Sequence, residues 1–232
     1  MTRAQKEQAI TELNKRIHAD MSLPLREIAI NTVPGEGNVD AEILFVGEAP
    51  GAKEDELGRP FVGAAGKLLD QLIESIGLKR QDVFIANLIK HRPPGNRDPL
   101  PEEIEAYTPY LDEQLKIIQP KLIVTLGRYS MGYFLGPNLK ISAVHGQPKR
   151  NAKGQVVIPM YHPAAALYSG NLRPVLFEDF KRVLKVLDLV KKGKMSTKEE
   201  KALQPVRQAH GEQVQGKEAE LAKVAETQKK LL

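Results

Sequence analysis

The chain has 232 residues, a formal net charge of +5 and no cysteine. The lack of thiols excludes disulfides, thiolate zinc sites and cysteine-ligated iron–sulfur clusters. No apolar run is long enough to span a membrane and the polar N-terminus does not suit a signal peptide, so we expect a cytoplasmic protein without a membrane partner.

The order of the apolar segments predicts an α/β protein. Residues 4–19 have apolar side chains at helical spacing, and further helices are expected at 67–76, 101–118, 128–135 and 174–190. Apolar strands are expected at 41–46, 82–89, 121–126 and 156–159, and a hairpin over 140–159. Because strands alternate with helices, we expect a mostly parallel central sheet with helices on both faces, which is a three-layer α/β/α sandwich.

A change of composition near Lys191 divides the chain. We expect residues 1–193 to form one catalytic domain. Residues 194–232 are rich in Lys, Glu, Gln and Ala and lack the apolar face that a packed helix needs. This charged tail is either flexible and solvated or a helix that binds a partner.

Glycine-rich and polar segments follow the expected strands where those strands end. The segment Gly47-Glu48-Ala49-Pro50-Gly51 follows the first strand, and Phe61 lies in a second glycine-flanked loop. Asn87 ends the next strand, and His162 follows the last one. Ligands of open α/β sheets bind at the carboxyl ends of the strands, so the topology predicts that Glu48, Phe61, Asn87 and His162 converge.

Each of these side chains also has a simpler interpretation. The first glycine-rich segment suits an ordinary strand-to-helix turn, and it is not a P-loop because no Gly-Lys-Ser/Thr follows. Taken alone, Phe61 suits a core position, Asn87 a bond to neighbouring backbone, and His162 a satisfied loop histidine. The occurrence of all four in this order, each near a strand end, favours a functional site.

The combined motifs resemble the family 4 uracil-DNA glycosylases over roughly residues 13–189. The similarity lies in Gly47–Gly51, in Gly58-Arg59-Pro60-Phe61-Val62-Gly63, in the segment from Asn87 to Arg97, and in His162-Pro163. The resemblance implies the three-layer fold and hydrolysis of the N-glycosidic bond of deoxyuridine in DNA, which is a base excision repair reaction.

The resemblance also implies roles for individual residues. The extruded base would stack on Phe61, and Asn87 would read its edge. His162 would donate a hydrogen bond to uracil O2 as the base leaves, and Glu48 would orient the attacking water. Glu54 is the candidate for the wall that excludes the thymine methyl group. The other residues expected to line the base pocket are Gly47, Ala49 and Gly51.

Basic and apolar residues near the site are expected to hold uracil-containing DNA. Phosphate contacts are expected from Lys90, Arg92, Arg97 and Arg173. Leu167 lies in the loop that follows the His-Pro pair. It is either a wedge that fills the hole left by the flipped base or a core leucine on a helix face.

One departure from the family is informative. The resemblance implies a four-iron, four-sulfur cluster on four cysteines, and the corresponding positions here are Asp20, Leu23, His91 and Tyr107. None of these is a thiol, so we expect an enzyme without a cofactor or metal. Contacts among the polar side chains of Asp20, His91 and Tyr107 would tie the same segments together.

The sequence leaves competing functions open. The first is a related glycosylase that binds uracil-DNA tightly or traps it through a histidine after Asn87, because His91 lies in that neighbourhood. The second is a catalytically idle DNA-binding module. The third is a nucleotide-metabolising α/β hydrolase, although the chain lacks a phosphate loop. The leading interpretation is a monomeric enzyme that removes uracil from DNA.

Overall fold

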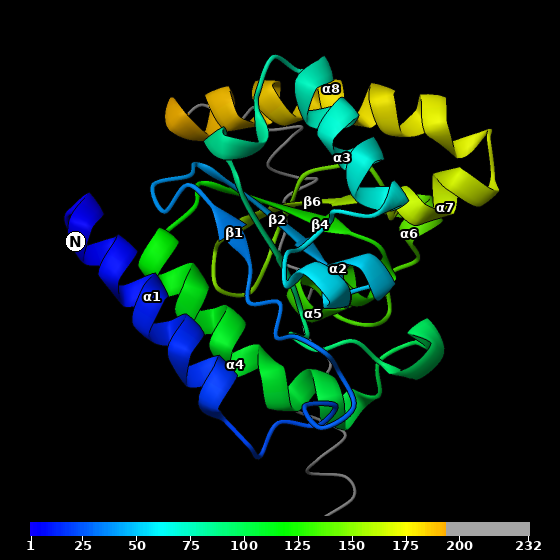
Figure 1. The fold of residues 1–232 in the computed structure, drawn as a ribbon. Coiled ribbons are helices and arrows are strands. Elements are labelled where there is room, and N and C mark those ends of the chain that lie inside the picture. The colour runs from blue at the N-terminus through cyan, green and yellow to red at the C-terminus, as the bar shows by residue number, and fades with distance from the viewer. Residues whose placement is uncertain (194–232) are drawn as a thin grey trace, which may run out of the picture.

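A computed structural model describes residues 1–193, which form one six-stranded sheet in the order β1-β3-β2-β4-β6-β5 (Figure 1). The central strands are parallel: β3 (Phe84–Asn87), β2 (Ile43–Gly47), β4 (Leu122–Leu126) and β6 (Val156–Met160). The short strands β1 (Glu36–Gly37) and β5 (Lys149–Arg150) pair antiparallel at the two edges. The expected mostly parallel sheet is confirmed.

Side chains of the central strands alternate between two apolar cores. In β2, Leu44 and Val46 belong to one core, and Ile43 and Phe45 belong to the other. All four are buried, because helices cover both faces of the sheet. Apart from Asn87 and Thr125, the residues of the central strands are therefore apolar, which is why these segments are recognisable in the sequence.

The first face is covered by α1 (Arg3–Ala19), α4 (Pro101–Ile118) and α5 (Arg128–Leu135) (Figure 1). A capping box between Thr2 and Gln5 begins α1. The apolar stripe of this helix, Ile10, Leu13 and Ile17, is buried in the first core. Helix α4 begins with a proline and two glutamates, which suit the positive end of the helix dipole.

The second face is covered by α3 (Ala64–Ser75) and α8 (Leu172–Lys191), with α7 (Pro163–Tyr168) beside both (Figure 1). The shorter elements are α2 (Ala52–Leu57), α6 (Ile141–Val144), η1 (Arg80–Asp82) and η2 (Pro94–Asn96). The two helical layers with the sheet between them make the predicted three-layer α/β/α architecture.

The hairpin expected over 140–159 is only partly present. Its second strand is β6, but its first strand is reduced to the two residues of β5. The segment before β5 forms α6 instead, and Val144 of this helix packs into the first core. Val144 is therefore buried by a helical turn rather than by a strand.

The topology sets the place of the site. Gly47 is the last residue of β2 and pairs with Asn87, the last residue of β3. Strand β6, which is separated from β2 by β4, ends two residues before His162. Within the described residues, no helix is both long and apolar enough to cross a membrane. The predicted tail, 194–232, lies outside the described residues.

Candidate functional site

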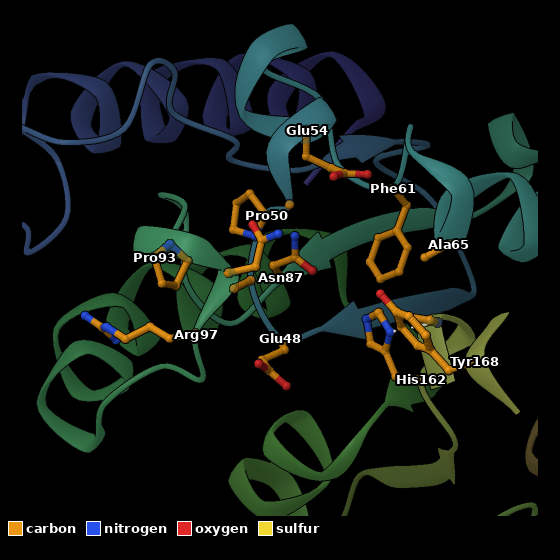
Figure 2. Close-up of a pocket in the computed structure, with 14 residues that line it drawn as sticks. Glu48, Pro50, Glu54, Phe61, Ala65, Asn87, Pro93, Arg97, His162 and Tyr168 are labelled. Carbon is orange, nitrogen blue, oxygen red and sulfur yellow. Dashed lines mark hydrogen bonds between the residues drawn. The ribbon is translucent and has the colours of Figure 1, made fainter. Parts of the chain in front are cut away.

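A cavity of about 390 Å³ opens at the carboxyl ends of β2, β3 and β6 (Figure 2). Its lining includes Glu48, Phe61, Asn87 and His162. The structure thus brings together the four side chains that the topology predicted to converge. Further predicted site residues in the lining are Ala49, Gly51, Glu54 and Arg97.

Asn87 and Phe61 line the cavity, and Gly47, which is not among the lining residues, approaches both of them closely. A Cβ on Gly47 would lie 2.4 Å from Asn87 Oδ1 and 2.5 Å from Phe61 Cζ, so only glycine fits at this position. The side chain of Asn87 is buried, and its Oδ1 has no hydrogen-bond partner within the described residues. Because buried acceptors are nearly always paired, this oxygen is suited to a donor on a bound ligand.

Phe61 is both a core residue and a wall of the cavity. The side chain is buried in the second core. Its ring also faces the cavity, 5.6 Å from the His162 ring between centroids and inclined by 28° (Figure 2). The core position that the sequence favoured for Phe61 alone and the ligand-facing position are therefore compatible.

His162 is held as a neutral hydrogen-bond donor. It caps α7, and its Nδ1 accepts the N–H of Ala164 at 3.1 Å. The ring proton of the neutral form must then lie on Nε2. Burial lowers the pKa of His162 to about 4, an effect that the nearby Glu54 carboxylate opposes. A neutral imidazole with Nε2–H can stabilise negative charge that develops in the cavity.

Glu48 has the raised pKa expected of a partly buried carboxyl group. Burial raises the pKa of Glu48 to about 7, the charge of Asp98 adds to the rise, and Arg128 opposes it. Arg128 in turn forms an ion pair with Asp98. A carboxyl group with a pKa near 7 can accept or release a proton near neutral pH, which suits a general base that activates water.

Glu54 holds the loop that carries Phe61. Its Oε1 accepts the N–H groups of Val62 and Gly63 at 2.9 and 2.8 Å. The carboxylate also lines the cavity (Figure 2). The sequence pointed to Glu54 only as a wall of the pocket, and its hydrogen bonds to the loop became visible only in the structure.

The predicted phosphate-binding residues do not share one environment. Arg97 lines the cavity and forms two hydrogen bonds with Glu103, at 2.9 and 2.5 Å. Arg92 is partly exposed and donates to Asn96 at 2.7 Å. Arg173 lies apart on α8, exposed, and donates to a glutamine of α3.

The position of Lys90 contradicts the prediction made from the sequence. Its side chain is fully buried, so the expectation that it contacts phosphate is wrong. The amine donates to the carbonyl oxygen of Asn87 at 2.7 Å and to Gln114 Oε1 at 2.9 Å. Burial lowers the pKa of Lys90 to about 7. Through these hydrogen bonds, Lys90 links the end of β3 to α4, and its amine does not face solvent or DNA.

Two neighbouring exposed side chains lie at the C-terminal end of α7. Leu167 is 46% exposed, which excludes the core position that the sequence left open for it. The next residue, Tyr168, is 93% exposed and lines the cavity mouth (Figure 2). Sequence reasoning missed Tyr168, although an aromatic residue next to the predicted wedge was a usable signal.

The four positions that correspond to the family's cluster ligands do not fit an iron–sulfur cluster. None is a cysteine, and Leu23 is an apolar core residue with no ligand atom. His91 Nδ1 lies 2.7 Å from the hydroxyl oxygen of Tyr107, which itself donates to the carbonyl of Pro24. No group of three or more His, Cys, Asp or Glu side chains within residues 1–193 has the arrangement of a metal site.

The expected mutual contacts of Asp20, His91 and Tyr107 are half correct. His91 and Tyr107 do bond, but Asp20 accepts from Tyr110 and from Ser22 instead.

The chain is similar to proteins of one family over most of its length. Residues 34–185 match the uracil DNA glycosylase superfamily. The type-4 uracil-DNA glycosylase of Sulfurisphaera tokodaii is 51% identical over 183 residues, which cover 75% of this chain and 83% of that protein. Those of Archaeoglobus fulgidus and Thermotoga maritima are 46% and 42% identical, cover 92% and 94% of those proteins, and match 76% of this chain in each case. With its fold, its cavity and these similarities, the chain belongs to the type-4 uracil-DNA glycosylases.

Proposed function

We propose that this chain hydrolyses the N-glycosidic bond of deoxyuridine in DNA after the nucleotide has been flipped out of the duplex. The observation that carries the proposal is the buried Oδ1 of Asn87, which has no partner among residues 1–193 and faces a cavity lined by Phe61 and His162. A base inside a duplex is out of reach, so an enzyme that acts on it needs such a pocket.

Recognition of the base rests on Asn87. Its Oδ1 accepts N3–H of uracil, and its amide N–H donates to O4. Cytosine has no proton at N3 and has an amino group in place of O4. In the same amide orientation, Asn87 Oδ1 would face the lone pair of N3, and the amide N–H would face the amino group, which is also a donor. The ring of Phe61 provides the stacking surface.

The reaction breaks the bond between C1′ and N1, and the bonding electrons leave with uracil as an anion. The neutral His162 donates Nε2–H to uracil O2, where part of this charge accumulates. The sugar develops oxocarbenium character, which an ionised Glu48 favours. Water adds to C1′ and its proton passes to the carboxylate, which completes the hydrolysis.

Discrimination and DNA binding use the rest of the site. Exclusion of the thymine methyl group by Glu54 stays a prediction, and the carboxylate's two bonds to the loop support a rigid wall there. Ala49 and Gly51 bring backbone to the base. Arg92, Arg97 and Arg173 are the phosphate contacts, and Leu167 with its exposed neighbour Tyr168 is the wedge.

Hydrogen bonds take the place of the family's cluster in this chain. Thr32 donates to His91 Nε2 (2.9 Å), His91 Nδ1–H donates to Tyr107, and Tyr107 donates to the Pro24 carbonyl. We call Thr32, His91, Tyr107 and this carbonyl the polar bridge. Burial lowers the pKa of His91 to about 4, so its two ring nitrogens act as one donor and one acceptor. A colourless, iron-free purified protein is the expected result.

The competing functions have less support. A trapping role for His91 conflicts with its burial and with the engagement of both ring nitrogens in the polar bridge. An idle DNA-binding module does not need Glu48, Phe61, Asn87 and His162 together, and the lack of a phosphate loop counts against a nucleotide hydrolase. The cytoplasmic location and the monomeric state stay predictions.

The decisive experiment is incubation with a duplex oligonucleotide that contains one uracil, followed by alkaline cleavage and measurement of free uracil. We expect strand cleavage and released base with uracil, and neither with a thymine control. A persistent protein–DNA adduct would favour the trap, and binding without release would favour the idle module.

A further inference from the structure

Phe61 has a backbone conformation that phenylalanine seldom adopts. Its φ is +51°, in the left-handed region that disfavours residues with a Cβ. This conformation turns the buried ring toward the cavity, beside the ring of His162. Strained conformations persist only where the surrounding structure holds them, so contacts outside the cavity must fix this backbone.

Arg80, in η1, supplies such contacts from behind the loop. Its Nη1 donates to the carbonyl oxygen of Phe61 at 3.0 Å, and its Nη2 donates to the carbonyl oxygen of Pro60. The guanidinium is itself fixed, by Nε to Glu36 at 2.9 Å and by Nη1 to Asp70 at 2.9 Å. Only 22% of the side chain is exposed, so this arrangement is well shielded from water.

The other side of the loop is held by a charge of opposite sign. Glu54 accepts the N–H groups of Val62 and Gly63, as described above. Helix α3 closes the space behind the turn, because a Cβ on Gly66 would lie 2.0 Å from the carbonyl oxygen of Phe61. The peptide groups of residues 60–63 are thus bound by one cation through their carbonyls and one carboxylate through their amides.

We propose that Arg80 is a positioning residue, which holds Phe61 in the conformation that stacks its ring on the extruded base. The proposal rests on the function proposed above, since the ring needs a bound base to stack on. Arg80 reaches both carbonyls through one planar fork, which the single ammonium group of lysine cannot reproduce. Arg59 is the matched control, because its hydrogen bonds within the described residues go to the same Glu36 and not to the loop.

The first test needs no DNA. The chain has no tryptophan, so Phe61→Trp introduces a single reporter at the position itself. We expect Arg80→Met in this background to shift the emission to longer wavelength and to increase quenching by acrylamide, and Arg59→Met to change neither. Equal emission and quenching in all three proteins would overturn the positioning role. If the Arg80→Met protein does not fold, Arg80→Lys takes its place.

The second test measures catalysis and product binding. Relative to wild type, Arg80→Met should slow single-turnover uracil excision by about tenfold or more and weaken inhibition by free uracil to a similar degree. Arg80→Lys should fall between, and Arg59→Met should stay close to the wild-type rate. Wild-type excision and inhibition in a folded but less stable Arg80→Met protein would mean that Arg80 acts on stability alone.

The two tests separate the two proposals. A tryptophan signal that depends on Arg80, together with a wild-type protein that releases no uracil, would overturn the glycosylase function and leave the loop-holding role intact. Normal uracil release with a signal that does not depend on Arg80 would overturn the positioning role and leave the function intact.

Discussion

The amide oxygen of Asn87 is buried and has no partner within the described residues. An unpaired buried acceptor costs about 1–3 kcal/mol in a folded protein. A bound base with an N–H at the right place removes that penalty, whereas a base without it does not. The unpaired oxygen of Asn87 therefore both lowers the stability of the free protein and makes binding selective for a base that carries an N–H group.

Asn87→Ala and His162→Ala should each reduce uracil excision by about 100-fold or more, because each removes a contact made to the departing base. The fold should survive, since the Asn87 oxygen has no hydrogen-bond partner within the described residues. Single-turnover rates and thermal melting curves check both halves of the prediction. Near-wild-type rates in both variants would show that Asn87 and His162 do not contribute to excision.

Glu48 should set the pH dependence of the reaction. With a pKa of about 7, its carboxyl group is protonated below that pH and ionised above it. If the ionised form orients the water, the excision rate should rise with pH and reach half its maximum near 7. Asp98→Asn removes a negative neighbour that raises the pKa of Glu48, so it should shift the curve to lower pH.

Substitution of Arg128 is the opposite control for this pH profile. Its charge lowers the pKa of Glu48, so Arg128→Gln should shift the curve to higher pH. A rate that is flat across neutral pH in all three proteins would exclude Glu48 from the catalytic step.

The contrast between Asn87 and Lys90 shows what the sequence could reveal at this scale. Asn87 ends a buried strand, and the carboxyl ends of parallel strands lie at one edge of the sheet, so its position could be predicted. Lys90 lies three residues later in a loop, where sequence alone makes a lysine look exposed. Its burial depends on an acceptor from Gln114, which is distant in the chain and comes close only through the packing of α4.

At the scale of elements, the polar bridge joins three segments of the chain by hydrogen bonds between buried side chains and one carbonyl. It connects the loop at Pro24 and Thr32 with the loop after β3 and with α4. The side chains of Thr32, His91 and Tyr107 are buried, so their hydrogen bonds replace bonds to water that burial excludes. The bridge therefore holds the loop that begins at Asn87.

Tyr107→Phe should lower the free energy of unfolding by about 1–3 kcal/mol, because it leaves His91 and the Pro24 carbonyl without a partner. Tyr110→Phe is the matched control: its hydroxyl bonds Asp20, which is partly exposed and can bind water instead. Urea denaturation measures both. Equal losses in the two variants would show that the bridge has no special role.

Most elements could be predicted from their periodicity, because one face of each helix and both faces of each central strand are buried. The segment before β5 could not. Its β-branched residues favour a strand, but the sheet already ends at β5 and leaves that segment without a neighbour to pair with. The bridge was half predicted, since Tyr107 and His91 were identified but the carbonyl of Pro24 has no sequence signal.

At the scale of the whole molecule, the chain has 34 basic and 29 acidic residues, a small excess of positive charge. Several arginines near the cavity are paired, including Arg97 with Glu103 and Arg128 with Asp98. DNA must therefore be held by a few exposed cations rather than by a strong overall field.

Arg92→Gln should weaken binding to duplex DNA at every sequence and reduce the slope of log K against log salt by about one. Lys90→Met should leave the slope unchanged, because the buried amine faces no phosphate. Fluorescence anisotropy titrations at several salt concentrations compare the two. A reduced slope for Lys90→Met would show that Lys90 contacts DNA phosphates after all.

The polar bridge has a consequence for the conditions under which this enzyme can work. Thiols are among the first groups that peroxide modifies in proteins, and this chain has none. Its bridge consists of hydroxyl, imidazole and carbonyl groups, which neither need iron nor react with mild oxidants. Repair by such a protein should continue under aeration and iron starvation, where assembly of a metal cluster would be limiting.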